Sequence, residues 1–144
     1  NIIMLQLRRE HADHKSYIPY TYWSDNVWRA IEPEGELPLW GIEQLKEHES
    51  AFIHEGTKAA RHVRWMVEAK TPAAKSALSA HPWGEELRHA AHLGWIGGAL
   101  SPHRTDWKVL HKLGLKRAYI VADNDAPGHA AVPKVARELR SFPI

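Results

Sequence analysis

Apolar residues are spaced in two ways along the chain, and each spacing predicts a different kind of element. Short, mostly apolar runs predict strands, which we place at residues 51–54, 95–96 and 118–122. The last is five apolar residues long and is expected to be buried on both faces. Apolar residues at helical spacing predict helices at residues 57–69, 84–93, 105–113 and 128–140. Pro133 lies inside the last helix and should either kink it or mark a later start. Segment 70–82, with two prolines and several small residues, is expected to form a loop.

The pattern before residue 50 is different. Residues 1–15 are mostly polar and show no clear period. The segment that follows is rich in aromatic and β-favouring residues, and it predicts a hairpin of residues 18–23 and 27–32. A short helix is predicted at 41–48. We therefore expect an N-terminal β-rich extension, residues 1–49, that packs on a domain formed by residues 50–144.

Predicted strands and helices alternate from residue 51 to residue 140. This order is typical of a parallel sheet whose strands are joined by helical crossovers. The sequence therefore predicts an α/β fold with a parallel sheet of three to four strands flanked by helices.

Composition excludes several classes of site and adds little about partners. With no cysteine, the chain has no disulfides, thiolate zinc sites or cysteine nucleophiles. The net charge of +2 is too weak to indicate nucleic-acid binding on its own. No apolar run approaches the ~20 residues that span a bilayer, and no signal-peptide pattern opens the chain, so we expect a cytoplasmic protein without a membrane partner. The seven tryptophans are expected in the core.

Two carboxylates follow the apolar run 118–122 directly, in the sequence Asp123-Asn124-Asp125. Ligands gather at the carboxyl ends of strands in open α/β sheets, and carboxylate oxygens suit a hard metal ion. Gly128 would let the chain turn closely into the next helix. Taken alone, the same run fits equally well a polar turn whose side chains cap that helix.

The other two predicted strands also end in notable residues, Glu55-Gly56 and Gly97-Gly98. In a parallel sheet these ends lie along one edge, so that Glu55 would meet the two aspartates. Three carboxylates repel one another unless a divalent cation neutralises them, and an all-oxygen set suits Mg²⁺ or Mn²⁺. Phosphate is the natural partner of such an ion, and Gly56 would let it approach a helix N-terminus.

The stretches "FIHEGTKAARHV" and "AYIVADNDAPGHAAVPKVARELR" together resemble the Toprim domain of primases, topoisomerases and some nucleases. The resemblance covers roughly residues 50–140 and rests on the strand-terminal Glu55-Gly56 and on Asp123 and Asp125. It implies a Toprim-like (Rossmann-like) sheet. A fourth strand commonly follows in the family, and this sequence stops where that strand would begin.

Within that superfamily the chain is most similar to Toprim modules of phage- and plasmid-type primases and primase-helicases. The phrase "LPLWGIEQLKEHES" before the first strand, the upstream tryptophans and "GGALSPHRTDWKVL" are similar to segments of those proteins. The resemblance implies Mg²⁺- or Mn²⁺-dependent primer synthesis from nucleoside triphosphates on a single-stranded DNA template, with a helicase or another replication domain as a partner. Glu55 would act as general acid or base or lie near the metal, while Asp123 and Asp125 bind it.

Further residues are expected to touch phosphate or nucleic acid. These are Gly56, Lys58, Arg61, Gly97, Gly98 and Gly128. Many primase modules carry an aspartate shortly after the Glu-Gly pair, where this chain has Ala59-Ala60. Two alternatives therefore stay open: strand cleavage of the nuclease or topoisomerase type, and a non-catalytic module that binds metal and nucleic acid.

Overall fold

The computed structural model describes residues 4–141, and the chain divides into two compact units after Glu36. The first unit is β-rich, in agreement with the predicted extension. Residues 37–49, which were expected to be part of that extension, belong to the second unit.

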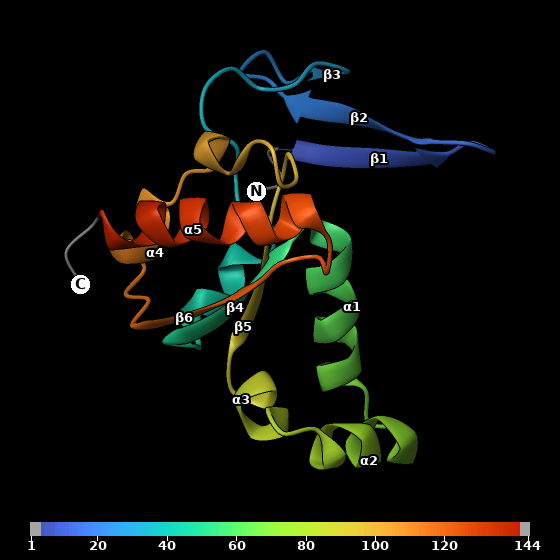
Figure 1. Ribbon diagram of the computed structural model, residues 1–144. Coiled ribbons are helices and arrows are strands. Elements are labelled where there is room, and N and C mark those ends of the chain that lie inside the picture. The colour runs from blue at the N-terminus through green and yellow to red at the C-terminus, as the bar shows by residue number, and fades with distance from the viewer. Residues whose placement is uncertain (1–3, 142–144) are drawn as a thin grey trace. The chain divides into compact units, whose positions relative to one another are not determined.

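The first unit is a three-stranded antiparallel sheet in the order β1-β2-β3 (Figure 1). Its strands are β1 (Met4–Glu10), β2 (Lys15–Tyr22) and β3 (Trp28–Arg29). The pairing of β2 with β3 confirms the predicted hairpin, although the second strand is shorter than expected. Strand β1 was not predicted, and it pairs with β2 along its whole length. Residues 1–3 of the supposedly aperiodic segment lie outside the described part of the chain.

The second unit contains a parallel sheet in the order β5-β4-β6. Its strands are β4 (Ser50–Glu55), β5 (Ala91–Trp95) and β6 (Arg117–Val121). The predicted three-stranded parallel sheet is therefore confirmed. The expectation that β6 is buried on both faces is wrong: Arg117, Ala118 and Val121 of β6 are exposed, whereas β5, at the other edge of the sheet, is buried throughout.

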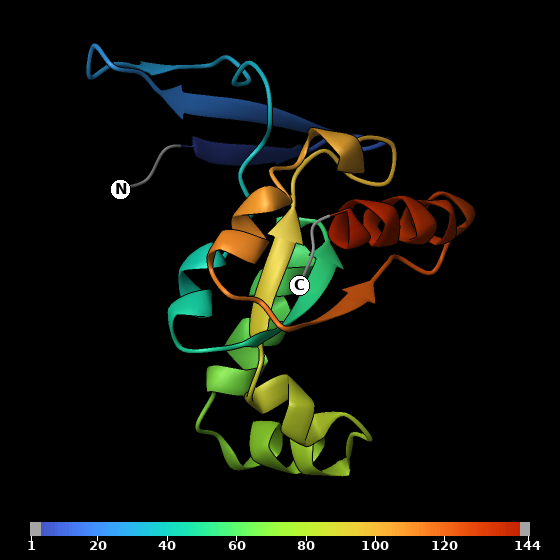
Figure 2. The ribbon, with the colours of Figure 1, turned by 90° about the vertical axis from the view of Figure 1, so that its left-hand side faces the viewer.

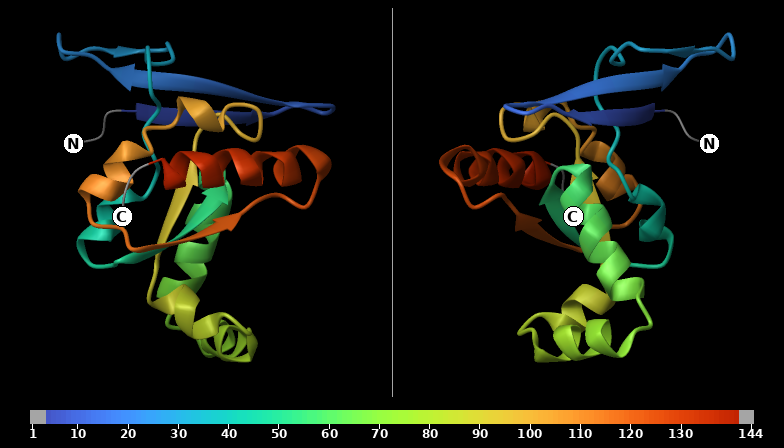
Figure 3. Two further views of the ribbon diagram at one scale, coloured as in Figure 1. Left: turned by 60° about the vertical axis from the view of Figure 1, so that its left-hand side comes forward. Right: turned by 90° about the vertical axis from the view of Figure 1, so that its right-hand side faces the viewer.

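Helices cover both faces of this sheet, with α1 on one face and α4 and α5 on the other (Figures 2 and 3). The α-helices are α1 (Thr57–Glu68), α2 (Pro72–Ala80), α3 (Gly84–Arg88), α4 (Lys108–Lys112) and α5 (Ala126–Arg140). Two 3₁₀ helices, η1 (Ile42–Lys46) and η2 (Pro102–Arg104), precede β4 and α4. Helix α5 starts two residues before the predicted start and continues through Pro133, so the proline does not mark a later start.

Two segments of the second unit differ from the prediction. The expected loop at 70–82 contains α2, because Thr71 caps the helix by accepting the Ala74 N–H at 3.2 Å and Pro72 takes the first helical position. The expected helix at 84–93 ends at Arg88, and the chain then forms β5. His92, which the sequence placed on that helix, is therefore a strand residue.

The core of the second unit lies between the sheet and helices α4 and α5. Ile53 and Leu93 of the sheet pack with Trp107, Leu110 and Val135 of the two helices and the segment before them. Trp95 and Trp107 are the two tryptophans that are buried in the core. The expectation for the tryptophans is wrong at four positions, which are at least 37% exposed: Trp23, Trp28, Trp65 and Trp83.

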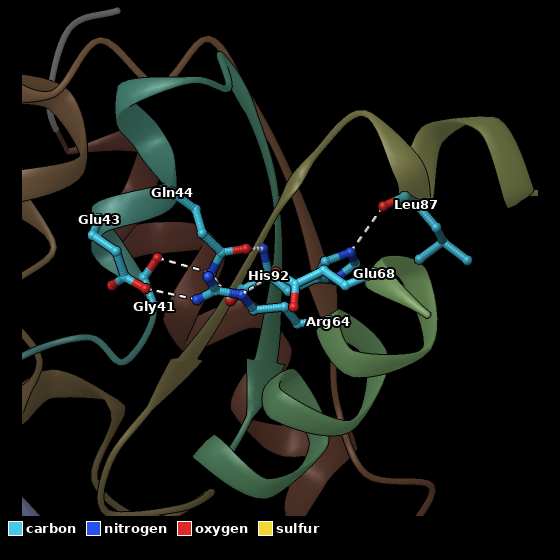
Figure 4. A network of polar contacts seen from close by, with 7 residues as sticks. All are labelled: Gly41, Glu43, Gln44, Arg64, Glu68, Leu87 and His92. Carbon is cyan, nitrogen blue, oxygen red and sulfur yellow. Dashed lines mark hydrogen bonds and ion pairs between the residues drawn. The ribbon is translucent and has the colours of Figure 1, made fainter. Parts of the chain in front are cut away.

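The outer edge of β5 is closed by residues that precede β4 in the sequence. The Gln44 side chain accepts the His92 N–H at 3.1 Å and donates to the His92 carbonyl at 2.9 Å, as a neighbouring strand would (Figure 4). Trp40 makes a pair of backbone hydrogen bonds with Gly94 at 2.9 and 3.1 Å. Because unpaired strand edges invite unwanted pairing, these contacts both fix η1 and protect the sheet.

Candidate active site

Glu55 and Asp123 meet at the carboxyl-terminal edge of the parallel sheet. Glu55 is the last residue of β4, and Asp123 follows β6, which pairs with β4. The Asp123 backbone N–H donates to Glu55 Oε2 at 3.2 Å, across 68 positions of sequence. The two motifs that the sequence singled out are thus in direct contact, as expected for parallel strand ends.

The Asp123-Asn124-Asp125 run forms the turn that leads into α5. The Asp125 N–H donates to the Asp123 carbonyl at 2.9 Å, and Asp125 Oδ1 accepts the Gly128 N–H at 2.7 Å. Asp125 is therefore the N-cap of α5, which confirms the capping interpretation of this residue. Capping uses one carboxylate oxygen and leaves the second for another contact.

Gly128 is buried where α5 passes the turn and the Glu55 side chain. A Cβ at this position would overlap the Asp123 carbonyl oxygen and lie 3.0 Å from Glu55 Oε2. The absence of a side chain at Gly128 is therefore what allows both motifs to come this close. This contact agrees with the expected close turn, while a contact of Gly128 with phosphate stays a prediction.

The start of α1 lies tightly against β5. Gly56 is the N-cap of α1 with φ of +92°, a conformation that favours glycine. On β5, a Cβ at Gly94 would lie 2.8 Å from the Gly56 carbonyl oxygen and 2.9 Å from Thr57 Cα. Gly94 was not predicted as a site residue, because it fell between the predicted helix 84–93 and the predicted strand 95–96 and was not assigned to a strand. A glycine between apolar residues, which often marks a close backbone approach, was the available signal.

The remaining candidates lie in the loop after β5 and on α1. Gly97 and Gly98 both have positive φ, and the Gly98 carbonyl accepts the Trp95 indole N–H at 3.1 Å. Lys58 and Arg61 are exposed on α1, and neither forms an ion pair with another residue in the part of the chain described. The structure gives the glycines a turn role, and phosphate contacts by these residues stay predictions.

The donors at this edge have the chemistry that Mg²⁺ or Mn²⁺ prefers, since they are carboxylate oxygens. Asp123 and Asp125 are exposed, and the Asp123 carboxylate makes no hydrogen bond within residues 4–141. Among those residues, however, no three acidic, histidine or cysteine side chains already converge as a metal site. Glu55, Asp123 and Asp125 would have to reorient their side chains to share one ion.

A buried histidine pair lies directly behind Glu55. His54 and His92 are 3% and 1% exposed, and their Nε2 and Nδ1 atoms are 3.2 Å apart. His92 Nε2 must carry a proton, because it donates to the Leu87 carbonyl at 2.9 Å (Figure 4). His92 Nδ1 then accepts from His54 Nε2, so the geometry fits two neutral rings.

Burial lowers the pKa of both histidines. Desolvation, followed by the nearby His92 ring, lowers the pKa of His54 to about 4. Desolvation also lowers the pKa of His92, partly opposed by its hydrogen bond to the Leu87 carbonyl. Both rings are therefore neutral near pH 7, and they support β4 without adding positive charge beside Glu55.

Comparison with protein-family models, with curated proteins and with solved structures finds no match for this chain. The chemistry of the sheet edge is therefore inferred from its own side chains. Within residues 4–141, no helix has both the length and the apolar character needed to cross a membrane.

Proposed function

We propose that the second unit is the Toprim-type catalytic module of a DNA primase, which joins nucleotides into an RNA primer on single-stranded DNA. The observation that supports this most is the contact between Glu55 Oε2 and the Asp123 N–H. It joins a strand-terminal Glu-Gly and a strand-terminal Asp-x-Asp at one edge of a parallel sheet. Either motif on its own could arise by chance. The two lie 68 positions apart in the sequence, so their contact supports the proposal more strongly than either motif alone.

Each side chain has a defined role in this proposal. Glu55 takes the proton from the attacking hydroxyl, and Asp123 and Asp125 hold Mg²⁺ or Mn²⁺. When bound, the ion supplies positive charge that balances the phosphate oxygens during nucleotidyl transfer. Lys58 and Arg61 contact phosphate from α1. A helicase or another replication domain is the expected partner.

The test is incorporation of labelled ribonucleotides on a single-stranded template, with Mg²⁺ or Mn²⁺ present. We expect Glu55→Gln and Asp123→Asn each to lower the initial rate by at least about 100-fold, the usual size of a general acid–base contribution. Glu86→Gln is the matched control, because Glu86 is an exposed carboxylate on α3. Synthesis that persists in both site variants would show that the site is wrongly assigned.

The same assay separates the alternatives. Cutting of plasmid DNA without primer synthesis, abolished by Asp123→Asn, would select the nuclease or topoisomerase type of reaction. A topoisomerase also needs a nucleophilic tyrosine, and Tyr17, Tyr20 and Tyr22 belong to the first unit, outside the stretch that resembles Toprim.

A non-catalytic metal-binding module is the second candidate. It is favoured by Asp125, whose Oδ1 atom caps α5, and by Ala59-Ala60, which stand where many primase modules carry an aspartate. Its signature would be an Asp123-dependent rise in thermal stability with Mg²⁺, in a protein that neither synthesises primers nor cuts DNA.

A further inference from the structure

Helix α1 turns a basic and aromatic face to solvent. Four exposed residues, Lys58, Arg61, His62 and Trp65, share this face, because the last three follow Lys58 by three, four and seven positions. We call this surface the α1 face. Trp65 is 65% exposed, more than any other tryptophan or tyrosine with a described exposure. The helix therefore holds a large, accessible ring and three basic side chains together.

The basic side chains lie close to the Trp65 ring. Arg61 precedes Trp65 by four positions, a spacing that puts neighbours on a helix surface about 5–6 Å apart. The His62 ring lies beside the Trp65 ring, with centroids 6.2 Å apart and 39° between the planes. Lys58 lies in the first turn of α1, which begins two residues after Glu55 (Figure 1). The α1 face thus runs from the candidate active site along the helix.

The charges around this face favour a polyanion. Lys58 and Arg61 form no ion pair with another residue among residues 4–141. Glu68, the one carboxylate of α1, pairs with Arg64, which also pairs with Glu43 of η1. Residues 57–83 contain five lysines and arginines and one glutamate, a net charge of +4, whereas the whole chain carries +2. The positive charge of the chain is therefore concentrated in the segment that includes α1.

The combination of ring and cations selects one kind of polyanion. Single-stranded nucleic acid offers phosphates to the cations and open base faces to the ring, and such surfaces combine basic grooves with stacking aromatic residues. A duplex hides the faces of its bases inside the stack, so it would leave the Trp65 ring unused. An acidic protein segment would pair with the cations without needing a flat ring beside them.

We infer that the α1 face binds single-stranded nucleic acid, with a base stacked on Trp65 and phosphates held by Arg61 and Lys58. The direction of the face leads the bound strand along α1 toward Glu55. The inference deepens the proposed function, and it rests on that function only in identifying the bound strand as the primase template.

The test is fluorescence anisotropy of a labelled oligo-dT strand titrated with the full chain, without Mg²⁺ or nucleotides. We expect Trp65→Ala to weaken binding about tenfold, the usual effect of removing one stacked base. Trp65→Phe keeps a ring and should lose at most about threefold. The matched control is Trp23→Ala. Trp23 is also exposed and its ring centroid lies 5.1 Å from Arg29 Cζ, but Asp25 neutralises that arginine.

Salt dependence tests the phosphate contacts separately. Arg61→Gln should weaken binding and lower the slope of log Kd against log salt by about 0.7, the contribution of one phosphate contact on a single strand. Lys112→Gln is its control, because Lys112 is an exposed cation of α4, on the other face of the sheet (Figure 3). We expect this control to keep the affinity and the slope of the unmodified chain.

Several results would overturn the inference. Unchanged binding by Trp65→Ala, or an equal loss in Trp23→Ala with unchanged circular dichroism, would show that the α1 face has no special part in binding. Equal affinity for a duplex of the same length would reject a single strand as the ligand. If Trp65→Ala abolished concentration-dependent self-association and left oligo-dT binding intact, the face would be a protein interface.

Failure of this inference can be told from failure of the proposed function. Strand binding that depends on Trp65, in a chain that makes no primer, would keep the inference and reject the primase. Primer synthesis that is unaffected by Trp65→Ala at limiting template would keep the primase and reject the inference.

Discussion

His54 and His92 are the two histidines that burial should make sensitive to acid. Both are neutral in the folded chain near pH 7, and the pKa of each lies below the ordinary histidine value. Below pH 6.5 the unfolded chain therefore binds protons that the folded chain does not. This difference lowers the free energy of unfolding as the pH falls from about 6.5 toward about 4.

We predict a decline of up to about 1.4 kcal/mol per pH unit from His54 in that range, with a further decline from His92, whose pKa is also lowered. Urea unfolding of the chain between pH 7 and pH 4.5 would measure it. The double variant His54→Gln/His92→Gln should flatten the slope, while His103→Gln, at an exposed position of η2, should not. An identical slope in the double variant would mean that other groups cause the acid sensitivity.

Asp125 combines two roles that substitution can separate. Its Oδ1 atom caps α5, and the proposed function gives its charge a part in metal binding. Asp125→Ala should lower the free energy of unfolding by about 1 kcal/mol, whereas Asp125→Asn, an equally good cap, should change it by only a few tenths.

Chemical denaturation of both variants measures the cap, and primer synthesis at varied Mg²⁺ measures the charge. We expect both variants to need more Mg²⁺ than the unmodified chain. If Asp125→Asn kept normal synthesis at every Mg²⁺ concentration, Asp125 would be a helix cap and nothing more.

At the level of elements, one side chain pairs with β5 at His92, next to the backbone pair that Trp40 makes with Gly94. Gln44 satisfies both backbone groups of His92 and also donates to the Gly41 carbonyl at 2.9 Å. Arg64 of α1 holds η1 from the other side through Glu43 at 2.6 Å, and it also pairs with Glu68 (Figure 4). Loss of Gln44 would leave two strand groups without partners.

Gln44→Ala should therefore lower the free energy of unfolding by about 1–3 kcal/mol, the cost of leaving partly buried polar groups unpaired. Glu47→Ala is the control, because Glu47 is an exposed residue just past η1. Hydrogen exchange at the His92 amide should accelerate in Gln44→Ala alone. Unchanged exchange would show that the amide is protected by something other than Gln44.

Sequence patterns predicted the elements that carry the candidate site better than those around it. The apolar residues of β4 and β6 are consecutive, and acidic residues follow each run closely, so the strand ends were predicted to within one residue. Strand β5 is buried throughout and includes His92 and Gly94, so it shows neither alternation nor a clean apolar run. The contact between His54 and His92 could not be predicted, because it depends on the register of β5 with β4.

Helix α2 and the edge position of β6 show two different limits of predicting structure from this sequence. The capping signal of Thr71 followed by Pro72 was present in the sequence, and the two prolines led to a loop being predicted instead. For β6, the local pattern cannot tell a central strand from an edge strand, because strand order is set by the crossovers and not by the run itself.

At the scale of the whole molecule, two motifs that are distant in sequence act as one site in the proposed function. Glu55 and Asp123 are brought together by the pairing of β4 with β6 and by the missing side chain at Gly128. Residues that act as a unit in catalysis give strongly non-additive losses when they are replaced together. This non-additivity can be measured without knowing how the metal ion and the substrates bind.

The most direct measurement is a double-mutant cycle of initial primer-synthesis rates for Glu55→Gln, Asp123→Asn and the double variant. We predict that the double variant is no more than about threefold slower than the slower single variant, because either change already disables the shared site. Losses that multiply across the two variants, as for independent positions, would contradict the claim that Glu55 and Asp123 form one catalytic site.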